Sequence, residues 1–431
     1  MDGRTRQASP AAANGRSLDP TADAPAGRVH AKQSAFYQRL FHRLFPQIDM
    51  PFRILLWNGE EFATAAGEPI ASVHFRDRAA FLRLLLQPDL AFGDAYSDGR
   101  IEVEGDLIAF LERVYRAQPA PASVDFLRRC LAGWWVRPSA NSANGSRRNI
   151  HHHYDLGNEF YRLWLDDQLV YTCAYFPNPD AGLDVAQTAK MDHVCRKLWL
   201  RPGENVVEAG CGWGSLARHM ARDYGVTVTA YNISKEQIAY ARKRAKAEGL
   251  ADRVHYVEDD YRNISGRFDA FVSVGMLEHV GPPHYRELGS VIQRCLKPTG
   301  RGLIHSIGRN FAAPTSPWLE KRIFPGSYMP CLREIMDVFE PMEFSVLDVE
   351  NLRLHYAKTL EHWLRRFEAV ADQVEKMFDQ RLVRAWRLYL AASLAGFTTG
   401  FMQLFQVVFA PATNNEIAWT RSRVYNPSAN S

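Results

Sequence analysis

The chain lacks several features that would place it in a common class. Its six cysteines form no C-x-x-C pair and no metal-ligand spacing, which argues against a disulfide framework and predicts free thiols in a reducing, cytoplasmic compartment. No apolar run precedes Ser34, so the sequence predicts no signal peptide. The formal net charge is only +4, which gives no overall basic field for nucleic acid. A membrane partner would therefore need a local patch.

A glycine-rich turn in VVEAGCGWGS (206–215) departs from the two commonest nucleotide-binding patterns. Its spacing is G-x-G-x-G rather than G-x-G-x-x-G, the next predicted strand ends in Asn232 rather than an acid, and no lysine supplies a phosphate-binding loop. Glu208 followed by Gly210, Gly212 and Gly214 is instead the pattern of S-adenosylmethionine binding. A glycine turn without a ligand remains the alternative interpretation.

Length and composition predict a globular protein of two domains. The 431 residues exceed the usual single domain, and 46% hydrophobic with 23% charged residues is enough for a large core. From Ile150 to about Tyr425 predicted strands and helices alternate, which indicates an α/β fold with a parallel, doubly wound, Rossmann-like sheet. The predicted strands are 205–208, 226–230, 254–257, 270–274, 302–305 and 344–349, and the predicted helices are 184–198, 235–248, 284–296 and 330–339.

The first 149 residues predict three further segments. Residues 1–33 are poor in large apolar side chains and are predicted to be disordered. Residues 119–149 predict a linker with an amphipathic helix, in which Trp134 and Trp135 lie among arginines. That helix suits a membrane interface, but docking on the protein's own surface fits the same pattern. Between them, 34–118 predicts a small α+β domain with strands at 52–57 and 71–75 and helices at 78–86 and 106–116.

Residues 388–410 contain no charged side chain and are long enough to span a bilayer. Glycines, threonines and glutamines interrupt the run, including Gly396, Gly400, Gln403 and Gln406. We therefore expect a buried helix, a break marked by glycine, and a buried strand that ends near Phe409.

Two polar pairs follow the second and third predicted strands. Asn232 and Gln237 flank the turn after the second strand and offer amide hydrogen bonds to a ribose. After the third strand, Asp260 can accept a hydrogen bond from an adenine amino group and Tyr261 can pack on its ring. A solvated acidic loop is the alternative for the second pair.

Seven motifs occur in one order in the region from Ile150 to Tyr425. They are HYDLGNEFYRLWLD (153–166), YTCAYF (171–176), VVEAGCGWGS (206–215), SVGMLEHVG (273–281), LIHSIG (303–308), IFPGSYMP (323–330) and HYAKTLEHW (355–363). This set resembles the cyclopropane-fatty-acyl-phospholipid synthase family, which includes the mycolic acid cyclopropane synthases. Residues 34–118 look like the extra N-terminal domain of the synthases that act on phospholipids.

The resemblance implies a class I methyltransferase fold and a particular reaction. In this family a methylene group passes from S-adenosylmethionine to a cis double bond of an unsaturated phospholipid acyl chain, and a bound bicarbonate takes a proton as the cyclopropane ring closes. The bicarbonate ligands of the family map onto Cys173, Glu278, His305, the backbone of Ile307, and Tyr356. Such a site must exclude water and strong nucleophiles, because either would quench the carbocation.

The same mapping extends the expected cofactor site beyond the glycine turn and its neighbours. The added positions are Tyr171, Thr172, Tyr261 and Val274. Ser393 departs from the family, because many members carry a cysteine there that was once proposed as a nucleophile. A transfer without a covalent enzyme intermediate does not need that thiol.

Two other functions remain open on the sequence. One is a methyltransferase of the same fold that retains the methyl group, on a branched acyl chain or another small acceptor, and the other is a non-catalytic lipid-binding protein. No metal is predicted, because adjacent ligands such as His151–His153 seldom converge on one ion. The expected partners are unsaturated acyl chains and, transiently, the inner face of the membrane, with a homodimer as a further expectation.

Overall fold

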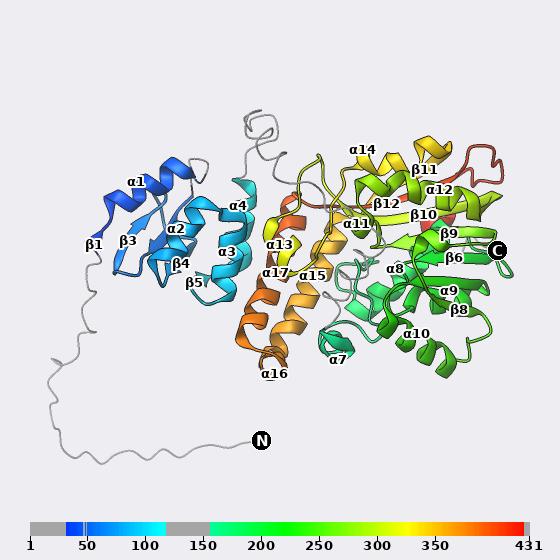
Figure 1. The fold of residues 1–431 in the computed structure, drawn as a ribbon, viewed down its shortest axis with the longest axis horizontal. Helices are drawn as coiled ribbons and strands as arrows, with labels where there is room; N and C mark the ends of the chain where they lie inside the picture. Colours follow the sequence, from blue (N-terminus) through cyan, green and yellow to red (C-terminus); the bar gives the residue numbers. More distant parts are fainter. Residues whose placement is uncertain (1–31, 46–47, 49, 118–155, 426–431) are drawn as a thin grey trace, which may run out of the picture.

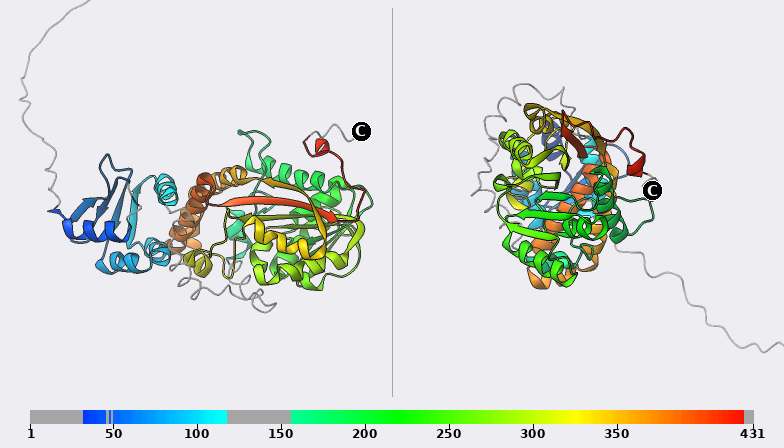
Figure 2. Two further views of the ribbon diagram at one scale, coloured as in Figure 1. Left: turned by 90° about the horizontal axis from the view of Figure 1, so that it is seen from above. Right: turned by 90° about the vertical axis from the view of Figure 1, so that its right-hand side faces the viewer.

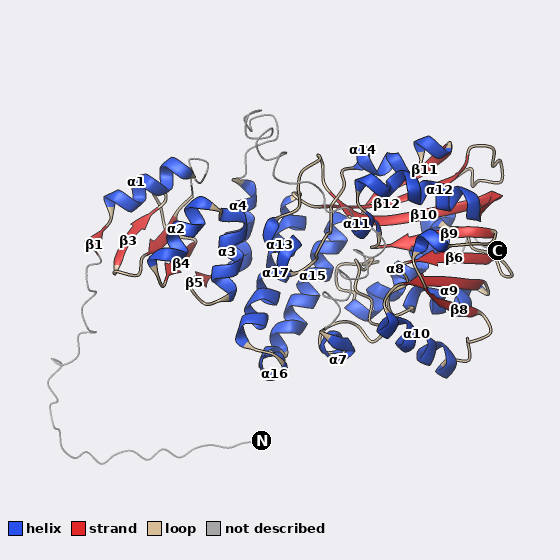
Figure 3. Ribbon diagram, viewed as in Figure 1, coloured by secondary structure: helices blue, strands red, loops and turns tan. Residues whose placement is uncertain are grey.

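A computed structural model of the chain describes residues 32–45, 48, 50–117 and 156–425. The described residues form a small sheet unit at one end and a larger α/β unit at the other (Figures 1 and 3). Most of the predicted tail, the predicted helix around Trp134 and Trp135, and the run His151–His153 lie outside the described residues.

The small unit is a five-stranded sheet with helices on one face. The strand order is β1-β3-β2-β4-β5. Alternate residues of the sheet, such as Phe52, Val73 and Phe75, are buried under the helices. The elements are β1 (Lys32–Gln33), α1 (Ala35–Leu44), β2 (Phe52–Leu55), β3 (Glu60–Ala63), β4 (Ala71–Phe75), α2 (Arg78–Leu86), α3 (Pro88–Ser97), β5 (Ile101–Gly105) and α4 (Leu107–Arg116).

Local sequence signals explain two of these helices. The Asp77 side chain accepts from the Ala80 amide at the start of α2, and Asp106 caps α4 in the same way. The strand at 71–75 and the helices at 78–86 and 106–116 were predicted, whereas the strand predicted at 52–57 ends at Leu55. β3, β5, α1 and α3 were not predicted.

The large unit is built on a seven-stranded sheet of order β11-β12-β10-β9-β6-β7-β8. The sheet is parallel, as predicted, except in one strand, because β12 pairs antiparallel with both β10 and β11. The other neighbouring pairs are parallel. The strands are β6 (Asn205–Ala209), β7 (Thr227–Asn232), β8 (Val254–Glu258), β9 (Phe268–Val274), β10 (Leu296–Gly308), β11 (Phe344–Asn351) and β12 (Gln403–Pro411).

Helices cover both faces of this sheet, as the doubly wound prediction requires. α8 (Leu183–Lys197), α9 (Ser215–Tyr224) and α10 (Lys235–Ala247) share one buried core with the sheet. On the opposite face, α12 (Tyr285–Cys295) and the helical turns between β10 and β11 share a second buried core with the sheet. Only the short helix α14 (Leu332–Ile335) and a 3-10 turn (Met336–Val338) occupy the range in which a helix was predicted, 330–339. The remaining helices are α7 (Gly157–Arg162), α11 (Leu277–Val280), α13 (Pro317–Arg322), α14 (Leu332–Ile335), α15 (Arg353–Ala369), α16 (Ala371–Met377), α17 (Gln380–Thr399) and α18 (Ser422–Tyr425).

The uncharged segment 388–410 forms a helix and a strand inside the protein. α17 ends at Gly400, whose φ of +79° is the left-handed conformation that glycine adopts freely, and β12 begins three residues later. All but the last residue of β12 are buried. This confirms the expected helix, break and strand. Among the described residues, none of the helices combines the length and hydropathy that a bilayer crossing requires.

The helix α17 joins the two units. Arg384 of α17 donates hydrogen bonds to the carbonyl oxygens of Tyr96 (2.6 Å) and Ile101 (3.0 Å) in the small unit. At Gly93 of α3, an added Cβ would lie 2.4 Å from the ring of Trp318, so the contact tolerates no side chain. The small unit therefore docks on the helices α13 and α17 rather than on the large sheet (Figure 2).

Candidate functional site

The glycine turn follows β6 and has no room for side chains at two of its positions. Gly210, Gly212 and Gly214 all have positive φ, at +83°, +52° and +76°. A Cβ on Gly210 would lie 2.9 Å from Met276, and one on Gly214 would lie 2.3 Å from the Tyr256 hydroxyl. Glycine is therefore required at Gly210 and Gly214, because a side chain there would strain the backbone and clash with its neighbours.

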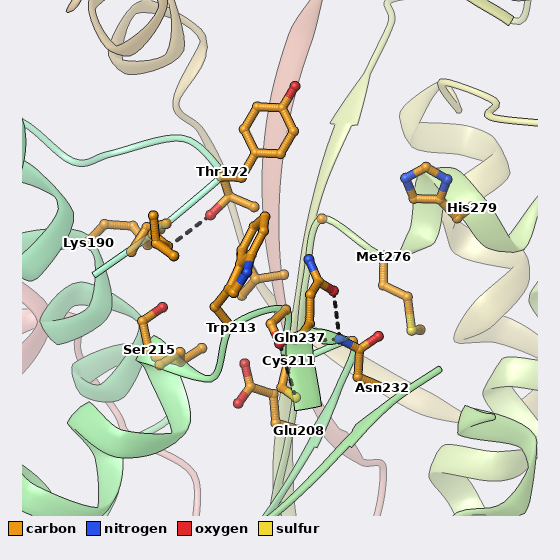
Figure 4. Close-up of a pocket in the computed structure, with 18 residues that line it drawn as sticks. Thr172, Lys190, Glu208, Cys211, Trp213, Ser215, Asn232, Gln237, Met276 and His279 are labelled. Carbon is orange, nitrogen blue, oxygen red and sulfur yellow. Dashed lines mark hydrogen bonds between the residues drawn. The ribbon is translucent and has the colours of Figure 1, made fainter. Parts of the chain in front are cut away.

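A cavity opens at the C-terminal ends of β6 and β7, above this turn (Figure 4). Most of the predicted cofactor residues line it, namely Tyr171, Thr172, Glu208, Gly210, Gly212, Asn232, Gln237 and Val274. Gly214, Asp260 and Tyr261 are not among the lining residues. The Asp260 carboxylate accepts from the Arg262 amide at 2.9 Å and from its guanidinium at 3.0 Å, so Asp260 begins a 3-10 turn beside the cavity.

Two amide side chains form one wall of the cavity. Asn232 Nδ2 donates to Gln237 Oε1 at 2.8 Å and to the Gly212 carbonyl at 3.2 Å, which ties the end of β7 to the glycine turn (Figure 4). Gln237 is held in place because Ser234 caps α10. Gln237 Nε2 is buried and has no hydrogen-bond partner among the described residues. A polar ligand in the cavity would satisfy that donor.

Sequence reasoning missed Lys190, a buried lysine that lines the same cavity. Its Nζ donates to Thr172 Oγ1 at 3.1 Å, and the side chain of Gln187, one turn earlier in α8, donates to the Thr172 carbonyl at 2.9 Å. Burial lowers the pKa of Lys190 to about 8. Burial also raises the pKa of Glu208, across the cavity, to about 7. The two groups lie close enough that each stabilises the charged form of the other.

Other missed lining residues lie inside the motifs that were recognised. Trp213 belongs to the glycine turn, and its indole N–H donates to Asn158 Oδ1 at 2.7 Å. Met276 and His279 belong to SVGMLEHVG, and burial lowers the pKa of His279 to about 4, which keeps that ring neutral. The motifs could therefore have pointed to Trp213, Met276 and His279 as site residues. Lys190 lies in none of the motifs, so the sequence offered no sign of its role.

Glu278 and Ile307 of the predicted bicarbonate set are in direct contact. The Ile307 amide donates to Glu278 Oε1 at 2.6 Å, although one residue lies in α11 and the other at the end of β10. Glu278 Oε2 is buried and has no hydrogen-bond partner among the described residues. Burial raises the pKa of this carboxyl to about 7.

His305 lies two residues before Ile307 on the same strand. Gln406 Nε2 of β12 is 3.1 Å from His305 Nδ1, and because an amide nitrogen only donates, Nδ1 accepts and the ring proton resides on Nε2. Burial lowers the pKa of His305 to about 3. The ring is therefore a neutral donor at its other nitrogen.

Cys173 and Tyr356 come from neighbouring elements. Cys173 is fully buried, which raises the pKa of its thiol, and the next amide, Ala174, donates to Thr359 Oγ1 at 3.0 Å. Thr359 follows Tyr356 by about one turn in α15, and the Tyr356 ring stacks on Phe397 at 4.5 Å. None of the five residues of the set lines the cavity, but their neighbours Thr172, Gly275 and Met276 do.

The cavity fits S-adenosylmethionine. The glycine turn admits a ligand against the backbone, and Gln237 Nε2 and Glu208 Oε2 are buried polar atoms without partners in the described part of the chain. The position, at the ends of parallel strands, is where open α/β sheets bind ligands. The sheet and the cavity together have the arrangement of an S-adenosylmethionine-dependent methyltransferase, which confirms the predicted fold class and agrees with the predicted methyl donor.

Comparison with known protein families identifies the family of this chain. The model of the mycolic acid cyclopropane synthetase family matches residues 141–407, and the chain belongs to this family. A second model, described as a domain of unknown function, matches residues 36–122.

Two relatives illustrate the range of names in the family. Cyclopropane-fatty-acyl-phospholipid synthase of Escherichia coli strain K12 is 36% identical over 360 residues, which cover 82% of this chain and 92% of the relative. Tuberculostearic acid methyltransferase of Mycobacterium tuberculosis is 32% identical over 427 residues, which cover 94% and 98%.

Solved structures are similar over the large unit. The cyclopropane synthase MmaA2 of Mycobacterium tuberculosis superposes with a TM-score of 0.59 at 26% identity and covers 61% of this chain and 98% of its own. Mycolic acid cyclopropane synthase CmaA1 in complex with SAH and CTAB gives 0.58 at 28% identity, over 61% and 97%.

Proposed function

We propose that this enzyme transfers a methylene group from S-adenosylmethionine to the cis double bond of unsaturated phospholipid acyl chains, with bicarbonate as the base. When bound, the cofactor supplies an electrophilic methyl group and bicarbonate supplies a weak base. The observation that carries the proposal is the buried Glu278–Ile307 pair, with Glu278 Oε2 left without a partner behind the cavity. The name of the Escherichia coli relative supports the choice of substrate.

The side chains of the set suit a small oxyanion that carries a hydroxyl. Ionised Glu278 would accept from the hydroxyl, while the neutral His305 ring would donate to an oxygen. The Ile307 amide donates to Glu278 and would hold its carboxylate in place for this contact. Tyr356 would add a further donor. These groups come from α11, β10 and α15, so the fold itself would position the base.

The same burial would protect a cationic acyl chain from side reactions. The raised pKa of Cys173 keeps its sulfur as a thiol, and a thiol is a far weaker nucleophile than a thiolate. The aromatic rings of Tyr356, Trp363 and Phe397 pack together nearby and expose little surface to water. Aromatic faces stabilise cations through their quadrupole, so this wall suits the proposed reaction.

The organisation of the chain around this function is also a proposal. We propose a tail at 1–33, an accessory lipid domain at 34–118, a linker at 119–149 and the catalytic domain at 150–425. We further propose a cytoplasmic enzyme that works transiently at the inner face of the membrane, as a homodimer.

Product analysis tests the proposal directly. Pure protein is incubated with S-adenosylmethionine, bicarbonate and vesicles of a cis-monounsaturated phospholipid. We expect the lipid to gain one CH2 in mass and to show ring-proton signals at high field in its NMR spectrum. Unchanged lipid across several headgroup classes would overturn the assignment.

A second candidate is a methyltransferase that retains the methyl group on a branched acyl chain. The similarity to tuberculostearic acid methyltransferase over 94% of this chain favours it. The same NMR spectrum separates the two, because without a hydride donor the methylated cation must lose a proton and keep a double bond. The branched product would therefore show new olefinic signals, distinct from those of the substrate, and no high-field ring protons.

A further inference from the structure

The first two helices of the small unit carry large apolar side chains on their outer surface. Phe36 and Leu44 of α1 are 66% and 42% exposed, and Leu82 and Leu86 of α2 are 38% and 82% exposed. The same helices bury other side chains, such as Phe41 and Phe81, in the core that the small unit shares with α15 and α17, so the exposed side chains lie outside that core. Exposed apolar side chains gathered in one place mark an interaction site.

The exposed residues share one face of each helix. In α1, the exposed Phe36, Arg43 and Leu44 follow the i, i+7, i+8 spacing, with the half-buried Leu40 between them, while Phe41 is buried in the core.

In α2, Ala79, Leu82, Arg83 and Leu86 follow the spacing i, i+3, i+4, i+7, while Phe81 is buried. The helices are neighbours, because the rings of Tyr37 in α1 and Phe81 in α2 meet edge to face at 5.5 Å. We call this combined outer face the α1–α2 surface.

The charges of the α1–α2 surface have a single sign. Neither AFYQRLFHRL nor RAAFLRLLL contains an acidic residue, whereas Arg39, Arg43, Arg78 and Arg83 are exposed. The nearest acid in sequence, Asp77, is already paired with Arg100 at 2.6 Å. The arginines of this face are therefore available to an anionic partner.

The opposite face of the same sheet provides the contrast. There Arg53 pairs with Glu61 and Arg76 with Glu102, so the arginines of that face are neutralised by neighbouring carboxylates. Only the helical face combines apolar side chains with uncompensated positive charge. That combination of Phe and Leu with Arg is the signature of a helix that lies in a bilayer interface.

We propose that the α1–α2 surface docks the enzyme on an anionic lipid bilayer, with Phe36, Leu82 and Leu86 entering the interface and the arginines contacting lipid phosphates. The inference rests on the proposed function, because it supplies the contact through which a membrane substrate is reached. Each arginine near an anionic surface strengthens binding about fivefold, and the burial of the apolar side chains strengthens it further.

Sedimentation of the full chain with vesicles tests the docking. We expect vesicles with anionic lipid to bind about tenfold more tightly than purely zwitterionic ones. Leu86→Asp should weaken binding to anionic vesicles about tenfold, and Arg39→Glu with Arg43→Glu should abolish the preference for anionic lipid. Val185→Asp is the matched control, since Val185 is 59% exposed on α8 of the other unit, and it should bind as the parent does.

A second measurement separates this proposal from the proposed function. On phospholipid dispersed in detergent, Leu86→Asp should be as active as the parent, whereas on vesicles its rate should fall with its binding. If the parent modifies no lipid in either form, the proposed function fails, and vesicle binding still decides the docking proposal. If Leu86→Asp and Val185→Asp bind vesicles equally well, the docking proposal is wrong.

Two further outcomes would assign the surface to another occupant. Loss of a dimer in Leu86→Asp by light scattering, with unchanged vesicle binding, would make the surface an interface between copies. Vesicle binding that begins only after deletion of residues 1–31 would mean that the tail covers the surface. Either result would overturn the proposal.

Discussion

The amide of Ile307 donates a 2.6 Å hydrogen bond to the carboxylate of Glu278, and this contact joins two segments that are 29 residues apart. Glu278 lies in α11, after β9, and Ile307 lies near the end of the neighbouring strand β10. The parallel pairing of the two strands therefore brings a buried acid to a backbone donor beside the cavity. The protonation of that acid is set by burial, which raises its pKa to about 7.

Glu278→Gln should abolish most activity without weakening cofactor binding. The amide keeps the shape and can still accept from Ile307, but it cannot carry the negative charge that the proposed base contact requires. We expect the rate of lipid modification to fall about 100-fold. Calorimetry with S-adenosylhomocysteine should give an unchanged Kd, because Glu278 does not line the cavity.

Glu340→Gln is the control for that experiment, since Glu340 is exposed. Its rate should equal that of the parent. A Glu278→Gln enzyme with full activity and cyclopropane product would show that the carboxylate has no part in the chemistry.

The pKa of Glu278 predicts a pH-dependent difference in stability. The Glu278 carboxyl has a pKa of about 7 in the folded protein, because burial raises it from the ordinary value of 4.5. Between these values the folded protein keeps a proton that the unfolded chain releases, so stability falls as pH rises. Relative to Glu278→Gln, the parent should lose at most about 3 kcal/mol of unfolding free energy between pH 4.5 and pH 8.

Urea unfolding of both proteins at these two pH values measures the difference. Other buried acids, such as Glu208 and Asp166, titrate in both proteins and cancel in the comparison. A difference that stays constant with pH would mean that Glu278 is ionised in the fold throughout.

The glycine turn offers a prediction with a matched control. Gly210 and Gly203 have nearly the same φ, +83° and +86°, so alanine should cost each about 1–2 kcal/mol of stability. Only at Gly210 would the new Cβ meet a lining residue, at 2.9 Å from Met276, while no heavy atom lies within 4 Å at Gly203. We expect Gly210→Ala to weaken S-adenosylhomocysteine binding at least about tenfold by calorimetry, and Gly203→Ala to leave it unchanged. Equal affinities would show that the turn does not approach the cofactor.

The sequence was sufficient to predict those parts of the fold that a local pattern of residues determines. The turn at Gly210–Gly214 has a spacing that only a strand-to-helix crossing with a close ligand requires, and the strands around it are recognisable by their apolar residues. The direction of β12 could not be read in the same way, because an apolar run is equally buried in either orientation. Its direction is set by its pairing with β10 and β11, which are distant in the sequence, so it is a tertiary property.

The side chains of the site also differ in how far a local sequence pattern predicts them. Glu278 and His305 were found through whole motifs, since a lone acid or histidine has no distinctive spacing. Asp260 was expected to face adenine, but the neighbouring Arg262 engages its carboxylate, and the sequence does not decide between a ligand and a neighbour. Lys190 looks like a solvent-facing lysine of an amphipathic helix, and only the packing of α8 on the sheet reveals that it is buried.

Lys190 and Thr172 should therefore be coupled, and a double-mutant cycle measures the coupling. Lys190→Met and Thr172→Val each remove one side of the 3.1 Å hydrogen bond, so the double variant should lose less stability than the sum of the single ones, by about 1 kcal/mol. Lys197→Met with Thr172→Val is the control, because Lys197 lies two turns further along α8 and its Nζ is 2.7 Å from Glu350 instead. The effects of that pair on stability should be additive within about 0.5 kcal/mol.

Lys190→Met and Thr172→Val should each also weaken S-adenosylhomocysteine binding, since Thr172 lines the cavity beside Tyr171. Additivity of Lys190→Met with Thr172→Val would mean that the lysine acts only through its charge, opposite Glu208, and not as the anchor of this segment.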